Sequence, residues 1–219
     1  MLTLAFDTTA NCCAIALLNN NVVIDKFTED MDFGQSEVLL PQIENILKKQ
    51  NVLFQDINLL AVCIGPGSFT GVRSSIACAR AMALANPNLA VTGVSAFEAY
   101  AHSLSMTELS EINAVIIETK RDDFYFQMFN GRLQKLCEPC ALNYENIIAN
   151  LKGKPVTLIG NGVERFLDKP SGLVLHAIRM DSVSNISDLA ACAIEKFNNK
   201  KLNFPKPLYL RAPDVCVKS

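Results

Sequence analysis

A glycine-rich segment in the first third of the chain is the feature that most constrains the fold. Residues 59–64 are a continuous apolar run of the kind that forms a buried strand, and residues 74–85 are rich in Ala, Ser and Cys. Between them, Gly65 to Arg73 reads Gly-Pro-Gly-Ser-Phe-Thr-Gly-Val-Arg. The pattern predicts a strand, a tight loop and a helix in this order, which is typical of an α/β protein.

The chemistry of this loop has two interpretations. Gly65, Gly67 and Gly71 could let backbone donors converge on a phosphate at the start of the helix. However, the spacing fits neither the NTPase loop G-x-x-x-x-G-K-[ST] nor the dinucleotide loop G-x-G-x-x-G, whose third glycine would come one residue earlier. The alternative is a tight turn in which Ser68 caps the helix and Gly71 permits close packing. Spacing alone leaves both interpretations open.

The N-terminal residues predict a three-stranded meander with an acidic turn. Apolar runs at 2–7, 12–18 and 22–27 are separated by polar turns, which places Asp7 at the end of the first strand. Asp7 and Thr8 could hold the water shell of a nucleotide-bound Mg²⁺. Actin-like ATPases usually have glycine within this turn, where this chain has Thr, so we favour a polar hairpin turn.

Helical spacing follows the meander. From Ser36 onward, apolar side chains recur at the positions of one helix face, namely Leu39, Leu40, Ile43, Ile46 and Leu47. Pro41 lies inside this pattern, where it removes a backbone donor, so we expect it to kink the helix or to confine its regular part to the residues that follow. A short strand at 89–92 and a helix with Ser95 as its N-cap are predicted next.

The second half of the chain opens with another hairpin. Strands are predicted at 112–117 and 124–129 around an acidic turn, with further strands at 156–159 and 173–175. We expect residues 1–108 to form an N-terminal lobe and residues 109–219 a C-terminal lobe. The last helix, at about 186–199, could pack back on the first lobe.

The composition narrows the classes of function. Of 219 residues, 20 are Lys or Arg and 22 are Asp or Glu, and a net charge of −2 creates no overall basic field for nucleic acid. If RNA is involved, we therefore expect a partner protein to bind it. The N-terminus lacks a basic leader, and no apolar run is long enough for a bilayer, so we expect a cytoplasmic protein without membrane contact.

The cysteines and histidines do not predict a metal centre. Two histidines, His102 and His176, are too few for a site of three imidazoles. Cys137 and Cys140 have the spacing of a redox or zinc pair, but no second pair or nearby His completes it, so we interpret it as incidental. Five further cysteines lie among apolar residues and are expected to be buried thiols, namely Cys12, Cys13, Cys63, Cys78 and Cys192.

Taken together, these residues resemble one family. The loop from Gly65 to Arg73, the Asp-Thr turn at residues 7–8 and the closing Pro-Leu-Tyr-Leu-Arg at 207–211 are similar to TsaB, also called YeaZ. This is the bacterial subunit for threonylcarbamoyladenosine modification of tRNA. The resemblance is strongest over residues 1–100, and it implies an α/β actin-like ATPase fold (ASKHA, ribonuclease H-like) with two lobes.

The resemblance also implies partners. The chain is expected to be a non-catalytic scaffold that binds its catalytic paralogue, TsaD, through the helices at 36–49 and 69–85. A TsaE-type ATPase joins, and tRNA is contacted only through the complex. The small-residue helix face would let another helix approach closely, and could make a homodimer when no partner is present. The predicted interface comprises Ser36, Leu39, Leu40, Ile43, Phe69, Val72, Arg73, Ile76, Ala77, Arg80 and Ala81.

The same resemblance implies that a metal site has been lost. The catalytic paralogue carries a His-x-x-x-His pair on the helix after the strand, where this chain has Ala96 and Tyr100, and a methyl group cannot ligate a metal. In the second-lobe hairpin, Glu118, Lys120 and Asp123 stand where Asp, Arg and Glu are common in the family. We therefore predict no catalytic residue and no metal site.

A second class of function stays open at this point. The chain could be an actin-like small-molecule kinase or ATPase acting on its own, with a nucleotide held by Asp7, Thr8, Gly65, Gly67 and Ser68. For the scaffold no cofactor is required, although ATP or ADP with Mg²⁺ could bind at the complex interface. No Ser, His and Asp set is assignable, so a peptidase of the M22 or glycoprotease type has no support.

Overall fold

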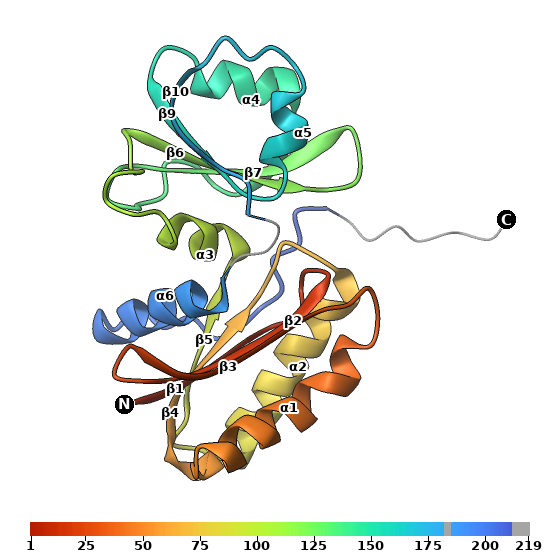
Figure 1. Ribbon diagram of the computed structural model, residues 1–219, viewed down its shortest axis with the longest axis vertical. Coiled ribbons are helices and arrows are strands. Elements are labelled where there is room, and N and C mark those ends of the chain that lie inside the picture. The colour runs from red at the N-terminus through yellow and green to blue at the C-terminus, as the bar shows by residue number, and fades with distance from the viewer. Residues whose placement is uncertain (182–184, 212–219) are drawn as a thin grey trace, which may run out of the picture.

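The computed structural model describes residues 1–181 and 185–211, which form two lobes that follow the same plan (Figure 1). Each lobe contains a five-stranded sheet, with the strand order β3-β2-β1-β4-β5 in the first and β10-β9-β6-β7-β8 in the second. In both sheets, three strands form an antiparallel meander, a fourth strand pairs parallel with the first strand of the meander, and a fifth pairs parallel with the fourth. The two-lobed α/β architecture with duplicated halves is therefore confirmed.

The first lobe contains five strands and three helices before the chain crosses to the second lobe. The strands are β1 (Leu2–Asp7), β2 (Cys12–Asn19), β3 (Val22–Asp30), β4 (Ile57–Cys63) and β5 (Ala90–Val94). The helices are α1 (Gln35–Lys49), α2 (Phe69–Ala85) and α3 (Ala96–His102), with a short 3-10 turn at Phe54–Asp56.

The second lobe holds the remaining strands, and the last helix returns from it to the first sheet. The strands are β6 (Ile112–Glu118), β7 (Asp123–Phe129), β8 (Cys140–Asn143), β9 (Pro155–Ile159) and β10 (Val174–Arg179). The helices are α4 (Tyr144–Leu151), α5 (Val163–Leu167) and α6 (Ile186–Asn198). Strand β8 and helices α4 and α5 are not predicted by the sequence pattern, because each is only four to eight residues long.

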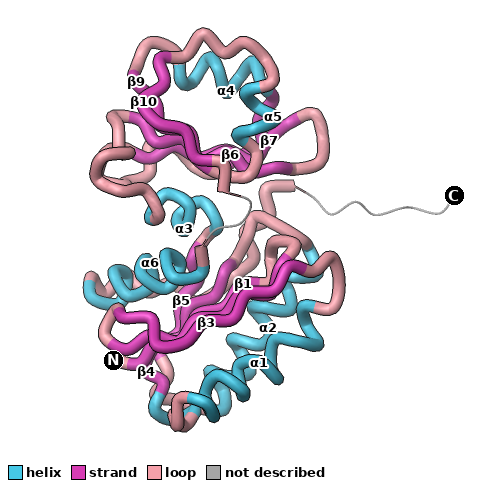
Figure 2. Tube along the Cα trace, in the orientation of Figure 1, coloured by secondary structure: helices cyan, strands magenta, loops and turns pink. Residues whose placement is uncertain are grey.

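The helices and sheets alternate as layers (Figure 2). Helices α1 and α2 cover one face of the first sheet, α3 and α6 lie between the two sheets, and α4 and α5 cover the far face of the second. Both faces of β1, β2 and β4 are therefore buried, which explains their continuous apolar sequence. The strand side chains that face α6 are small, as at Ala5, Ala14, Ala16 and Ala61, so that this helix can lie close to the sheet.

One local prediction about the first-lobe helices needs correction. Pro41 neither ends α1 nor confines it, since the helix begins at Gln35 and continues through Pro41 to Lys49. The buried side chains Leu39, Ile43, Ile46 and Leu47 keep the helix on the sheet and offset the lost hydrogen bond. Helix α2 has the range 69–85 that the resemblance implies, and it begins at Phe69 because Ser68 is its N-cap and accepts a hydrogen bond from the Gly71 N–H at 3.3 Å.

Several cysteine thiols are buried, and both histidine side chains contact oxygen atoms of the protein. Cys12, Cys13, Cys63 and Cys192 are buried as expected, whereas Cys78 on α2 is half-buried, because it lies at the margin of the helix face that contacts the sheet. The imidazole of His102 contacts the Glu195 carboxylate at 3.0 Å, and that of His176 contacts the Thr107 carbonyl at 3.1 Å. Within residues 1–181 and 185–211, none of the helices is long and apolar enough to cross a membrane.

Candidate functional site

The loop after β4 is locked against the first hairpin. The Ser68 N–H donates to the Thr9 carbonyl at 2.7 Å, and the Thr8 hydroxyl donates to the Gly71 carbonyl at 2.8 Å and contacts Ser75. A side chain at Gly71 would overlap the Thr8 carbonyl oxygen, and one at Gly67 would overlap that of Thr9. The glycines therefore serve close packing, as the tight-turn interpretation predicts.

This contact leaves little of a phosphate cradle. The Thr9 N–H donates to the Asp7 carboxylate at 2.7 Å, and the Ser68 and Gly71 N–H groups also have protein acceptors. A phosphate site needs several backbone donors that converge on open space. Here these three N–H groups are already paired within the protein, so the contact between hairpin and loop does not support a phosphate site built from them.

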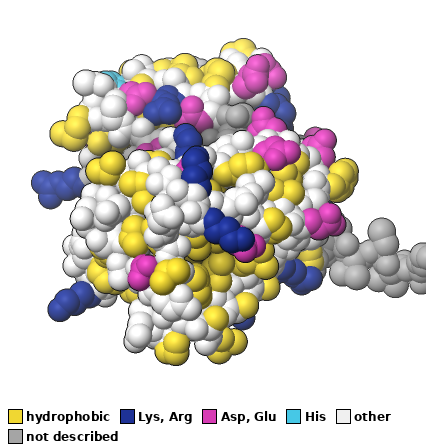
Figure 3. Space-filling model, turned by 60° about the horizontal axis from the view of Figure 1, so that its bottom comes forward, with side chains coloured by type: hydrophobic (Ala, Val, Ile, Leu, Met, Phe, Trp, Pro, Cys, Tyr) yellow, Lys and Arg dark blue, Asp and Glu magenta, His cyan; other side chains and the backbone are white. Residues whose placement is uncertain are grey.

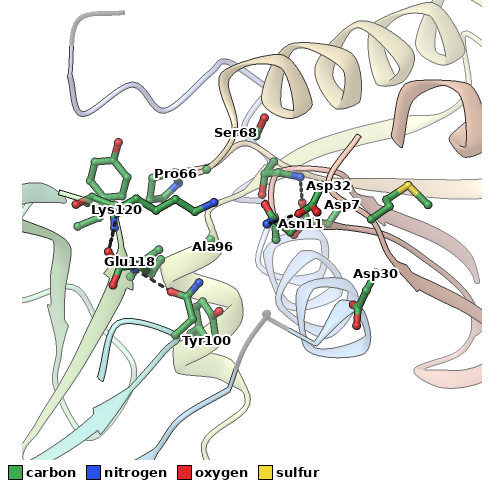
Figure 4. A pocket seen from close by; sticks show the side chains of 18 residues that line it. Asp7, Asn11, Asp30, Asp32, Pro66, Ser68, Ala96, Tyr100, Glu118 and Lys120 are labelled. Atoms are coloured by element: carbon green, nitrogen blue, oxygen red, sulfur yellow. Dashed lines mark hydrogen bonds between the residues drawn. The ribbon is translucent and has the colours of Figure 1, made fainter. Parts of the chain in front are cut away.

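A cleft of about 720 Å³ opens between the lobes beside this contact (Figure 4). Its first-lobe wall contains Asp7, Asp30 and Asp32, and its second-lobe wall contains Glu118 and Lys120. In Figure 4 the Lys120 side chain reaches from the second-lobe hairpin toward the first lobe. Carboxylates outnumber cations in this lining, which repels phosphate groups.

The second-lobe hairpin has its own ion pairs. The Glu118 carboxylate accepts two hydrogen bonds from the Arg165 guanidinium, at 2.6 and 2.8 Å. Partial burial would raise the pKa of Glu118, but these bonds and backbone N–H donors outweigh it and lower the pKa. Asp123 pairs with Arg211, which joins the hairpin to the end of the described chain. Glu118 thus ties the hairpin to α5 within the second lobe, and Asp123 ties it to Arg211.

Ala96 and Tyr100, where the resemblance implies that a pair of metal-binding histidines has been lost, lie on α3. Ala96 and Tyr100 are both buried, and the Tyr100 hydroxyl donates to the Asp181 carbonyl at 3.3 Å. Burial, followed by the negative charge of Asp7, raises the pKa of Tyr100 above its ordinary value, so the phenol stays protonated. No group of three His, Cys, Asp or Glu side chains suited to a metal lies within residues 1–181 and 185–211.

The predicted partner interface divides into two sets. Ser36, Leu40, Phe69, Arg73, Ala77, Arg80 and Ala81 are exposed. Leu39, Ile43, Val72 and Ile76 are at most 4 % exposed. These four were wrongly assigned to the interface, because they belong to the inner faces of α1 and α2, where they pack within the lobe. The sequence periodicity identifies an apolar helix face, but the sheet already covers it.

An outer apolar surface remains on the two helices. Leu84 is 85 % exposed on α2 and Leu40 is 54 % exposed on α1, with Ala77 and Ala81 on the same side as Leu84. The helices are joined by a hydrogen bond of 2.7 Å from the Ser36 hydroxyl to the Ser74 hydroxyl. Hydrophobic side chains gather on the face of the molecule that carries this pair (Figure 3). We call Leu40, Ala77, Ala81 and Leu84 the helix-pair surface.

Comparisons with known proteins identify the family. A family model described as TsaD, tRNA N6-adenosine threonylcarbamoyltransferase, matches residues 34–158. A TsaB protein of Buchnera aphidicola subsp. Baizongia pistaciae is 31% identical over 169 residues, which is 74% of this chain and 76% of that protein. The Escherichia coli K12 TsaB is 28% identical over 219 residues, covering 95% and 94%. The chain belongs to the TsaB family.

Solved structures support the fold of this TsaB-family chain. The YeaZ structure from Pseudomonas aeruginosa has a TM-score of 0.82 at 23% identity and covers 95% of this chain and 99% of that one. A ROK hexokinase from Thermus thermophilus has a TM-score of 0.51 at 12% identity, covering 91% and 100%. The actin-like fold predicted from the sequence is therefore confirmed.

One feature of this TsaB-family chain was not predicted from its sequence. Residues 202–211, which we call the C-terminal strap, lie beside α2 and β5 without forming a helix or strand. The strap is held by backbone hydrogen bonds from Gly93 to Asn203 at 2.8 Å and from Leu208 to Ile64 at 2.9 Å. Arg80 also donates to the Pro205 carbonyl at 3.0 Å. The paired prolines at 205 and 207 were the only local signal of this extended course.

Proposed function

We propose that this chain is a scaffold subunit in the biosynthesis of threonylcarbamoyladenosine in tRNA, and that it acts by binding a TsaD-type catalytic subunit. The proposal rests on the exposed helix-pair surface, in which small and apolar side chains lie on the neighbouring helices α1 and α2. Such a surface suits packing against another pair of helices. Family membership supplies the process, since the curated relatives bear the name of this pathway.

We further propose that the chain carries out no chemistry of its own. Ala96 and Tyr100 offer no suitable metal ligand. The N–H groups of Thr9 and Ser68 already donate hydrogen bonds to protein acceptors. In the complex, the catalytic subunit transfers the threonylcarbamoyl group to adenine beside the anticodon, and a TsaE-type ATPase joins. Because the substrate is tRNA, we place this function in the cytoplasm.

The partner interface can be tested with Ala81→Arg. Ala81 is exposed, so the monomer should stay folded, while the long charged side chain should block helix packing and abolish co-purification with the TsaD-type subunit. Ala149→Arg on the exposed side of α4 is the matched control and should leave the complex intact. A complex that survives Ala81→Arg would place the interface elsewhere.

The rival function, an independent kinase or ATPase, makes an opposite prediction. Titration of Mg-ATP into the isolated chain should release no binding heat, because the N–H groups of Thr9, Ser68 and Gly71 already have acceptors. Tight binding with phosphate release, both lost in Asp7→Ala, would establish a nucleotide site and remove the basis for a scaffold without chemistry.

A further inference from the structure

The C-terminal strap and α2 together concentrate positive charge. Six of the chain's 20 Lys and Arg residues lie in α2 or in residues 199–211, and none of its 22 Asp and Glu residues does. The local field at this edge is therefore positive although the chain's net charge is −2. The overall composition hides this, because the remaining surface is correspondingly acidic.

The cations follow the line of the strap. Arg80 and Arg73 lie two turns apart on α2, about 10 Å along its axis. Arg80 contacts the strap at Pro205, and Arg73 donates to the Tyr209 hydroxyl at 3.0 Å. Lys206 is exposed between these two contacts, and Arg211 ends the described strap. We call Arg73, Arg80, Lys206 and Arg211, with the neighbouring Arg121, the cationic ridge.

Aromatic rings alternate with these cations. The Arg73 guanidinium lies 3.5 Å from the centre of the Phe69 ring, which in turn packs against Tyr209 with centres 5.2 Å apart. The Arg80 guanidinium lies 5.6 Å from the Phe204 ring. Tyr209 is 44 % exposed and Phe204 is 55 % exposed, so their faces remain accessible beside the arginines.

The ridge ends at a cavity of about 370 Å³. Its wall contains Phe69, Tyr125 and Tyr209 together with the cations Arg121 and Arg211. Arg211 also pairs with Asp123, so part of its charge is neutralised there. The volume is at the lower end for ligand pockets, and the lining offers both flat rings and cations. A planar ring attached to an anion matches this chemistry.

We propose that the cationic ridge binds the phosphate backbone of a single-stranded segment of tRNA and that the cavity accepts one of its bases. Proteins that bind single-stranded nucleic acid combine a cationic track with aromatic rings on which bases stack. Arginine suits this role because its guanidinium can bond phosphate and stack at the same time. An acidic protein surface would match the charge but would leave the exposed rings without a stacking partner.

The inference rests on the proposed function, because the RNA would reach the ridge while the catalytic subunit holds it. It changes the expectation that tRNA is contacted only through the partner. The ridge borders the helix-pair surface, because Arg73 and Arg80 contact the strap and also lie one turn from Ala77 and Leu84 on α2.

The charge contribution is tested on the complex with the TsaD-type subunit, using Lys206→Ala combined with Arg121→Ala. Binding of an unmodified tRNA that reads codons beginning with A is measured between 50 and 300 mM salt, a range over which rising ionic strength increasingly screens the phosphate contacts. Two lost phosphate contacts should reduce the slope of log affinity against log salt by about 1.4 for a single strand. The control pair Lys26→Ala with Lys152→Ala removes two exposed lysines away from the ridge and should leave the slope unchanged.

The stacking contribution is tested with Tyr209. Tyr209→Ala should weaken tRNA binding about 5-fold or more, whereas Tyr209→Phe keeps the ring and should keep the affinity. An RNA oligonucleotide should compete with tRNA better as a single strand than as a duplex. Equal competition by the duplex would overturn the single-strand assignment.

The remaining outcomes separate this inference from the proposed function. Unchanged salt slope and affinity in the ridge variants, with the complex intact, would overturn the RNA contact and leave the scaffold function standing. Ridge variants that release the catalytic subunit would show that the ridge is a protein contact. Ridge-dependent binding of tRNA by the isolated chain would support the inference even if Ala81→Arg failed to disrupt the complex.

Discussion

At the scale of single residues, glycine decides how the first hairpin meets the loop. Gly67 and Gly71 have no side chain where the carbonyl groups of Thr9 and Thr8 approach, and no other residue type leaves that space. Thr8 adds two buried hydrogen bonds to the same contact. The motif that suggests a phosphate loop in the sequence is therefore used to join β1 to α2.

This account predicts a large cost for adding one methyl group. Gly71→Ala should lower the free energy of unfolding by about 3 kcal/mol, because the new Cβ must displace either the helix or the Thr8 carbonyl. Urea denaturation followed by circular dichroism measures this value. Gly153→Asn is the comparison, since Gly153 has φ +89 and open space around it, which Asn tolerates. Equal stability of Gly71→Ala and the wild type would mean that the hairpin contact is loose in solution.

At the scale of the elements, one carboxylate joins α3, α6 and the second lobe. Glu98 is N3 of the capping box that begins α3, and its side chain bonds the Ser95 N–H at 2.9 Å. It also pairs with Lys196 of α6 at 2.9 Å and with Lys135, which follows β7, at 3.2 Å. Burial alone would raise the pKa of Glu98, but the two lysines and the capping bonds outweigh it and lower the pKa to about 2.

The depressed pKa predicts acid sensitivity. An unfolded Glu titrates near its ordinary value, so the stabilisation by ionised Glu98 is present above about pH 4.5 and is lost as the pH falls toward about 2. The shift corresponds to roughly 3 kcal/mol. Glu98→Gln should therefore be markedly less stable than the wild type at pH 6, and the difference should shrink by pH 3.

Denaturant titrations at both pH values provide the measurement. Glu44→Gln is the control, because Glu44 pairs with Lys48 on the exposed side of α1, where solvent weakens the pair. A Glu98→Gln deficit that is the same at pH 3 and pH 6 would show that the ion pair does not stabilise the fold.

At the scale of the whole molecule, the first lobe depends on a helix from the end of the chain. The α6 side chains Leu189, Ala190 and Ala193 are fully buried in the cluster that includes Ala5, Ala16 and the residues of α3. A chain that stops after the first lobe would expose this apolar surface. The predicted boundary near residue 108 therefore separates the two sheets, but we do not expect residues 1–108 to fold independently.

The dependence can be tested by truncation. Residues 1–108 alone should give poorly dispersed amide resonances and should aggregate, because α6 no longer covers the inner face of the first sheet. Residues 1–108 joined by a flexible linker to residues 185–211 should recover dispersion, since α6 and the strap are restored. Native-like spectra from residues 1–108 alone would contradict this view of the core.

The sequence by itself determined the strand and helix alternation of the first lobe, the cap at Ser95 and the two repeated hairpins, because these follow from local periodicity and turn chemistry. It also carried the family resemblance. It did not distinguish the inner from the outer face of α1 and α2, since both contain apolar residues and only packing shows which face the sheet covers.

Only the tertiary structure decided the fate of the glycine-rich loop and the course of the strap. Whether a backbone donor is open to a ligand depends on its partners in the fold, and here Thr9, far away in sequence, accepts the hydrogen bond of the Ser68 N–H. The cationic ridge likewise joins α2 to residues more than a hundred positions later. Contacts between residues so far apart in the sequence leave no periodic signal in it. They can be identified only from the tertiary structure.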